Sequence, residues 1–227
     1  MKKRVLSAIV MLLVFIPLLL IGGKAFAVFM SLLAVMGLYE ILNIRETKKK
    51  FPFLMPLVFI NDNKKYNLND ALFLIGSTLF IGLSFNLIII TRNYDILYIV
   101  YMLLITTITD TFALFTGMLI GKHPLAKDIS PKKTVEGLLG GLFMGTVIAV
   151  VFYHVGINPK LPLSILVLIT LLLASVGQIG DLVFSSIKRY YGKKDFSNLI
   201  PGHGGILDRL DSIIFVVLAS VLFLGII

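Results

Sequence analysis

Four aspartates lie in or beside apolar stretches of the sequence, where an ionisable group is costly to bury. Asp110 stands within TTITDTFALF and Asp181 within GQIGDLVFSSIKR, while Asp208 and Asp211 come just before SIIFVVLASVLFLGII. An ionisable group inside a membrane span costs about 2.5–3.5 kcal/mol on insertion scales and usually marks a functional site. We therefore take these four carboxylates as the start of a candidate site.

Helical spacing groups further polar residues with these acids. Asp208 and Asp211 are three residues apart and share a helix face. One face of the helix predicted around Asp181 presents a carboxylate, a hydroxyl and a cation in order: Asp181, Ser185, and Lys188 or Arg189. Two glycines beside that acid, Gly177 and Gly180, predict a close approach to another helix.

Several carboxylates at a similar depth cannot all stay ionised without a counter-ion, so either some are protonated or a divalent cation neutralises them. Oxygen ligands suit Mg²⁺, which commonly takes one or two carboxylates and completes its shell with substrate phosphates and water. Two basic, glycine-containing loops accompany the acids, at 121–137 and 188–205. Together these are the parts of a phosphoryl or nucleotidyl transfer site. The plainer alternative is internal ion pairs, such as Asp208 with Arg209 or Asp181 with Lys188.

The elements that carry these residues are expected to be membrane helices. The chain of 227 residues is 58% hydrophobic and 15% charged, with a mean hydropathy of +0.98, unlike a soluble domain. It has no cysteine, which excludes disulfides and thiolate chemistry. We predict an all-α, polytopic transmembrane helical bundle of about seven spans, at roughly 5–22, 25–43, 71–91, 95–120, 137–156, 161–187 and 206–227. The stretch 51–60 is too short to span and is interpreted as re-entrant or interfacial.

Basic residues predict how the chain is oriented. With the N-terminus in the cytoplasm, only Lys24, Arg92 and Lys160 of the 21 Lys and Arg residues fall on the opposite side. The first apolar stretch is expected to stay as a helix rather than to be removed as a signal peptide. This threading puts the four acids in the cytoplasmic half of the membrane. It divides the chain into N-terminal helices, 1–91, with a cytoplasmic loop at 44–70, and a catalytic part, 92–227, with cytoplasmic loops at 121–136 and 188–205.

The stretch SSIKRYYGKKDFSNLIPGHGGILDRLD, 185–211, resembles the signature of the phosphatidate cytidylyltransferase family, also called CDP-diacylglycerol synthases. The resemblance rests on these residues: Ser185, Lys188, Arg189, Lys194, Asp195, Ser197, Pro201, His203, Gly204, Gly205, Asp208, Arg209 and Asp211. Upstream, Asp110–Thr111, the sequence GKH at 121–123 and ISPKKTVEG at 129–137 are also similar. The resemblance is strong over 95–227 and rests on hydrophobic layout alone before 92.

Three departures from the family pattern stand out. Phe112 occupies a position where the family usually has glycine, and Lys127 and Asp128 replace a proline–lysine pair. The N-terminal part is also shorter than in other family members, by about two spans around 44–70. An even number of missing spans would leave the catalytic loops on the same side of the membrane.

The resemblance implies a multi-pass enzyme of the cell (inner) membrane that converts CTP and phosphatidate to CDP-diacylglycerol and pyrophosphate, with its active site facing the cytoplasm. It implies Mg²⁺ as cofactor, with Asp181, Asp208 and Asp211 as ligands. Catalytic roles are assigned to Asp208, Asp211, Lys188 and Arg189. Substrate contacts are assigned to Ser185, Lys194, Asp195, His203, Gly204, Gly205, Arg209, Lys132, Lys133 and Asp110. CTP, phosphatidate and the bilayer are the expected partners; the charge of +9 is assigned to topology rather than to nucleic acid, and a homodimer is left open.

Two other functions fit the residues. One is a CTP-dependent enzyme that acts on another lipid, such as an isoprenoid. The other is an ion-coupled transporter, since intramembrane acids also bind ions; the acids lie near one membrane face, however, and no inverted repeat is present. Glu40 and His154 are interpreted as structural.

Overall fold

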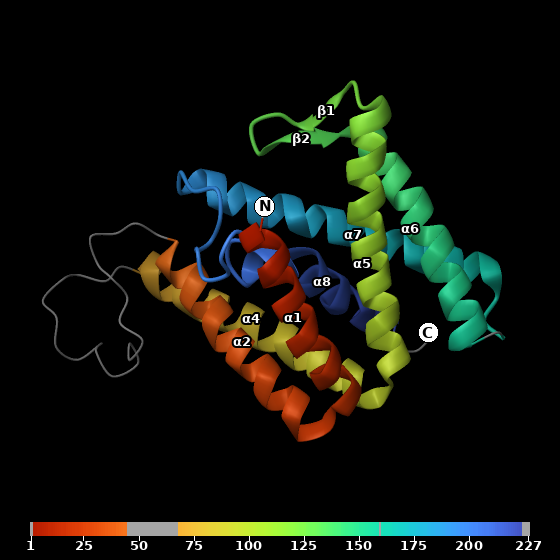
Figure 1. The fold of residues 1–227 in the computed structure, drawn as a ribbon, viewed down its shortest axis with the longest axis horizontal. Coiled ribbons are helices and arrows are strands. Elements are labelled where there is room, and N and C mark those ends of the chain that lie inside the picture. Colours follow the sequence, from red (N-terminus) through yellow and green to blue (C-terminus); the bar gives the residue numbers. More distant parts are fainter. Residues whose placement is uncertain (1, 45–67, 159, 224–227) are drawn as a thin grey trace, which may run out of the picture.

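Helices make up most of the part of the chain that the computed structural model describes, which is residues 2–44, 68–158 and 160–223 (Figure 1). In chain order the elements are α1 (Lys2–Ile21), α2 (Gly23–Asn43), α4 (Leu68–Tyr94), α5 (Ile96–Ile120), β1 (Pro124–Ala126), β2 (Ser130–Thr134), α6 (Val135–Gly156), α7 (Leu163–Tyr190), α8 (Leu207–Ser220) and a 3-10 turn (Val221–Phe223). The predicted helical architecture is confirmed, and each predicted span overlaps one of these α-helices.

Five of these helices are long and apolar enough to cross a membrane. They are Gly23–Asn43, Ala71–Tyr94, Ile96–Ile120, Val135–Gly156 and Leu163–Tyr190. The apolar part of α1, Val5–Ile21, is shorter, and α8 has 14 residues. A multi-pass membrane protein is therefore established, while seven spans remain a prediction. The 51–60 stretch lies outside the described residues.

The 121–136 segment contains a β-hairpin, which the all-α prediction missed. Strands β1 and β2 pair antiparallel, with Pro124 opposite Thr134 and Ala126 opposite Ser130. The strands have three and five residues, which is too short for an alternating pattern to show in the sequence. Thr134 ends the hairpin and also caps α6, because its side chain accepts a hydrogen bond from the N–H of Gly137 at 3.1 Å.

Glycines set how closely the helices pack. Helices α5 and α6 lie side by side, with the hairpin at their shared end (Figure 1). A Cβ at Gly141 would lie 2.5 Å from the carbonyl oxygen of Thr109, so only glycine allows this contact. Gly177 and Gly180 do the same on α7, where added Cβ atoms would lie 3.0 Å from Val216 and 2.6 Å from Phe215. The predicted close approach at these two glycines is confirmed, and the partner is α8.

The polar segments gather at one end of α7. That helix has 28 residues and is about 42 Å long at 1.5 Å per residue. Its C-terminal end meets the hairpin and the loop 191–206, whereas Lys160 precedes its other end. Arg92 also lies away from the hairpin, because it donates hydrogen bonds to the carbonyl oxygens of Leu19 (2.8 Å) and Leu20 (2.7 Å) at the turn between α1 and α2.

Candidate active site

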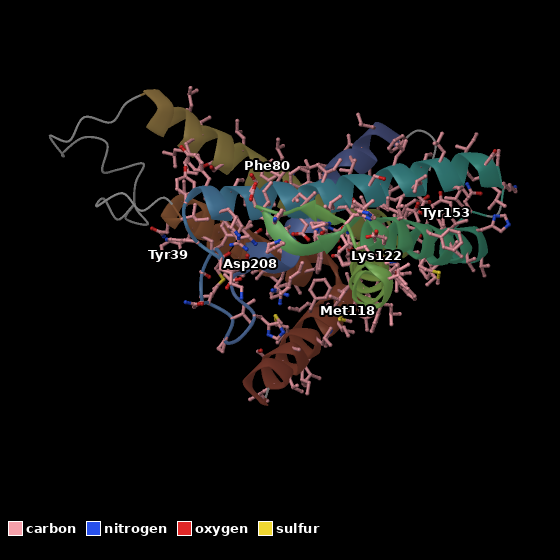
Figure 2. All side chains as sticks on the ribbon, turned by 90° about the horizontal axis from the view of Figure 1, so that it is seen from above. Tyr39, Phe80, Met118, Lys122, Tyr153 and Asp208 are labelled. Carbon is pink, nitrogen blue, oxygen red and sulfur yellow. The ribbon has the colours of Figure 1, made fainter. Side chains whose placement is uncertain are left out.

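A pocket of about 370 Å³ lies between α5, α6, α7, α8 and the hairpin. Seen from above, Asp208 is near the middle of the molecule and close to the hairpin, where nitrogen and oxygen atoms gather (Figure 2). The pocket brings together nine of the residues predicted from the sequence: Asp110, Lys132, Lys133, Asp181, Lys188, Asp195, Asp208, Arg209 and Asp211. All four starting carboxylates are thus in one place.

Asp208 is the most firmly held of these acids. Its Oδ1 accepts a hydrogen bond from Lys188 Nζ at 2.7 Å, and its Oδ2 accepts from the backbone N–H groups of Phe196 (2.9 Å) and Gly205 (2.8 Å). The Asp208 side chain is 3% exposed and that of Lys188 is 9% exposed. The carboxylate therefore joins the end of α7, the loop 191–206 and the start of α8.

Asp181 has a more open environment. Its Oδ2 pairs with Lys133 Nζ from the hairpin at 2.6 Å, and its Oδ1 accepts a hydrogen bond from Ser185 at 3.2 Å. Both charged side chains of this pair keep about a quarter of their surface exposed, at 24% and 22%. The alternative of internal ion pairs is therefore right for two of the acids but wrong about their partners. Asp181 and Asp208 are paired, but Asp181 with Lys133 and Asp208 with Lys188.

Asp110 joins three helices inside the pocket. Its Oδ1 accepts a hydrogen bond from Gln178 of α7 at 2.5 Å, and its Oδ2 accepts a longer one from Ser212 of α8 at 3.5 Å. Gln178 lies one helical turn before Asp181. Sequence reasoning missed Gln178, although a polar residue three positions from an acid in an apolar helix is a signal for the same face.

Two exposed cations line the pocket without an acidic partner. Within the described part of the chain, neither Lys132 nor Arg209 takes part in an ion pair. Lys133 and Lys188, by contrast, each neutralise an aspartate. An incoming polyanion would therefore find Lys132 and Arg209 available at once.

The remaining predicted site residues lie around the pocket rather than in its wall. Arg189 donates hydrogen bonds to the carbonyl oxygens of Ile129 (3.1 Å) in the hairpin and Lys193 (2.7 Å). His203 Nδ1 is 2.8 Å from the Ser7 hydroxyl of α1. Lys194 is exposed and outside the lining.

Gly204 and Gly205 each pack closely against a carboxylate of the protein itself. Gly204 has a φ of 85°, and a Cβ there would lie 2.8 Å from Asp208 Oδ2. A Cβ at Gly205 would lie 2.5 Å from Glu40 Oε1. Both glycines are therefore needed for close packing, and the oxyanions beside them are Asp208 and Glu40.

Carboxylate oxygens from separate helices are available to a metal ion among the described residues. No three Asp, Glu or His side chains in the described ranges are grouped closely enough to hold a metal between them. Asp181 and Asp211 line the same pocket, and no donor among the described residues contacts Oδ2 of Asp211. Two carboxylates completed by substrate phosphates suit Mg²⁺, so these donors fit that ion. Asp208 could join them only if Lys188 left its Oδ1.

Arg189→Lys tests the link between the hairpin and the loop. Lysine keeps the charge but lacks the planar group that reaches both carbonyl oxygens. We expect kcat/KM for CTP, the substrate that the family resemblance implies, to fall about threefold to tenfold, the scale of one typical lost hydrogen bond. The measurement is kcat/KM for CTP and for phosphatidate at matched folded protein. Wild-type kcat/KM values for both substrates would show that Arg189 contributes only to the orientation of the chain in the membrane.

Comparison with known proteins places the chain among membrane lipid enzymes. The model of the Cytidylyltransferase family matches residues 2–62 and 51–227. Phosphatidate cytidylyltransferases of Staphylococcus haemolyticus (strain JCSC1435) and Staphylococcus aureus (strain COL) are each 36% identical over 251 aligned residues, covering 95% of this chain and 96% of the relative. That of Staphylococcus epidermidis (strain ATCC 35984) is 34% identical over 250. These alignments are longer than the 227 residues of the chain, so the chain has gaps where its relatives have residues. The two stretches that the family model matches overlap at 51–62.

Proposed function

Because the chain belongs to the cytidylyltransferase family, we propose that it converts CTP and phosphatidate to CDP-diacylglycerol and pyrophosphate in phospholipid biosynthesis. The observation that carries this proposal is the single pocket that gathers Asp110, Asp181, Asp208 and Asp211 with four cations. The names of the staphylococcal relatives support phosphatidate over an isoprenoid lipid as the acceptor.

The reaction joins two anions in one pocket. An oxygen of the phosphatidate phosphomonoester attacks the α-phosphorus of CTP, a new P–O bond forms, and the bond to the bridging oxygen breaks to release pyrophosphate. The attacking oxygen is already a nucleophile, so the protein must mainly bring the anions together and stabilise the charge that builds on the leaving group. Lys132 and Arg209 supply that charge first, since no acid neutralises them in the described structure.

Lys133 and Lys188 have a second role in this proposal. Each pairs with an aspartate before substrate binds, so that the negative charge of the acid is balanced. Lys133 comes from the hairpin and its pair with Asp181 is partly exposed, so it can exchange this partner for a phosphate oxygen. Lys188 is buried against Asp208 and keeps its partner.

Asp181 and Asp211 are the residues that would hold Mg²⁺ in this pocket. Bound Mg²⁺ would supply positive charge to the triphosphate and to the leaving pyrophosphate. Asp208 positions Lys188 and the backbone of the loop 191–206. Asp110 positions Gln178 and faces the same pocket.

The site belongs at the cytoplasmic face of the inner membrane in this proposal. CTP is soluble, while phosphatidate is held in the bilayer with its phosphate at the level of the head groups. A pocket at the end of the helices, with Leu114 and Leu138 in its wall beside the charged groups, suits both.

Purified protein in detergent, offered CTP, dCTP or ATP with phosphatidate and with or without Mg²⁺, tests the proposal. The proposal would be contradicted if pyrophosphate were released without a lipid acceptor, or if no pyrophosphate were released in the presence of phosphatidate.

Labelling of single cysteines tests the topology. The chain has no cysteine of its own, so Lys127→Cys, Asn198→Cys and Lys160→Cys each create one exposed thiol. We expect the first two to react from the cytoplasm and the third from outside, because Lys160 lies beyond the opposite end of α7. A membrane-impermeant maleimide, applied to intact cells and to opened membranes, makes the measurement. Reaction of the first two thiols on different sides would contradict the threading.

A further inference from the structure

Glu40, near the end of α2, is a buried carboxylate for which the proposed reaction has no use. It is 2% exposed and does not line the pocket of about 370 Å³. Removing a carboxylate from water is costly unless it is fully hydrogen-bonded. Its contacts therefore explain why the chain keeps it there.

Within the described part of the chain, the hydrogen bonds to the Glu40 carboxylate all come from the segment that leads into Asp208. Oε1 accepts from the Ser197 hydroxyl at 2.6 Å and from the N–H of Ile206 at 2.9 Å. Oε2 accepts from the N–H of Leu207 at 2.9 Å. The first N–H groups of a helix have no partner within it, and a negative charge there is favourable. Glu40 thus caps α8 from a different helix.

Gly205 connects this cap to the active site. Its N–H donates to Asp208 Oδ2, while its Cα lies so close to Glu40 that an added Cβ would be 2.5 Å from Oε1. Only the backbone of residues 205–207 lies between the Glu40 carboxylate and Asp208. Any shift of Glu40 is therefore passed to Gly205 and to the start of α8.

We propose that Glu40 is a positioning residue of the active site: it holds the backbone of 205–207 where Asp208 meets Lys188. The inference rests on the proposed function of the pocket and adds a requirement for α2. Among the residues that the structure describes, the side chains of Lys132 and Arg209, which would meet the substrate anions, make no hydrogen bond to this segment; only the backbone N–H of Arg209 does, to the carbonyl oxygen of Ile206 at 3.0 Å. Loss of Glu40 should therefore affect turnover more than substrate binding.

Glu40→Gln is the sharpest variant, since glutamine has the same size but directs an NH₂ group at one of the backbone N–H donors. We expect kcat to fall at least about tenfold, the equivalent of 1.4 kcal/mol, with KM for CTP changed less than about threefold. Met30→Ala is the matched control, because Met30 is 1% exposed on the same helix and is not part of the contacts above. It should lower the melting temperature in detergent but leave kcat per folded molecule unchanged.

A second measurement does not depend on activity. Amide hydrogen exchange over 205–207 should accelerate at least about tenfold in Glu40→Gln and stay at the wild-type rate in Met30→Ala. Wild-type kcat in Glu40→Gln, or equal losses of kcat in both variants, would overturn the proposal; so would unchanged exchange. If the wild-type protein itself did not convert CTP and phosphatidate, the proposed function would fail, and the exchange result alone would decide the role of Glu40.

Discussion

Asp208→Asn is expected to lower turnover at least about 10²-fold and to destabilise the protein as well. The first effect is on the scale of losing one preorganised electrostatic contact. The second follows because Lys188, with 9% of its side chain exposed, would lose its counter-ion. Breaking a buried pair on one side costs about 3–5 kcal/mol. Steady-state kinetics and thermal unfolding in detergent measure the two effects separately.

Two further variants give this prediction its controls. Asp195→Asn makes the same substitution in the same pocket, at a residue whose side chain has no hydrogen-bond partner among the described residues, so its melting temperature should match the wild type. Asp208→Asn combined with Lys188→Met should be more stable than Asp208→Asn alone, because no unpaired charge stays buried. If Asp208→Asn were as stable as the wild type, the anchoring role would be wrong. Normal turnover across a Mg²⁺ titration would exclude a role in catalysis.

Asp181→Asn should produce an equally large loss of turnover with a smaller loss of stability than Asp208→Asn. We expect at least about a 10²-fold fall in kcat/KM for CTP and a higher Mg²⁺ concentration at half-maximal rate. The fold should survive because the Asp181 and Lys133 side chains each keep about a quarter of their surface exposed, against 3% and 9% for Asp208 and Lys188, although Lys133 Nζ itself is buried. Kinetics over a range of Mg²⁺ concentrations, together with thermal unfolding, make the measurement.

Ser185→Ala is the comparison for this second prediction. Ser185 contacts Asp181 only through one hydrogen bond of 3.2 Å, so its loss should cost much less than the loss of the charge. A large fall in stability for Asp181→Asn would show that the residue is structural. An unchanged response to Mg²⁺ would remove it from the proposed ligands.

The sequence predicted the helices and the convergence of the acids well. A long apolar stretch has few structures open to it in a membrane, and a carboxylate within one must face a polar interior. This is why Asp110, Asp181, Asp208 and Asp211 could be assigned to one pocket. The spacing of Asp181 and Ser185 also predicted a contact that the structure contains.

The pairing of charges could not be predicted in the same way. Lys133 reaches Asp181 from a hairpin whose strands are too short to leave a pattern, so spacing along α7 suggested Lys188 instead. Glu40 carried the same signal as the four aspartates, an acid within a predicted span. Its interpretation as structural named no partner, because the segment it caps is remote in sequence, 157 to 167 residues away.

The contact between α2 and the start of α8 bears on which parts of this chain can be shortened. This chain aligns with longer staphylococcal relatives and its two family-model matches overlap at 51–62, after α2 has ended at Asn43. A deletion there spares Glu40, so residues can be lost between α2 and α4 without removing the cap on the catalytic segment. An artificial enzyme trimmed further from the N-terminal side would lose that cap with α2. In terms of chain length, the proposed role of Glu40 requires the smallest active unit to include α2, even though α2 does not line the pocket of about 370 Å³.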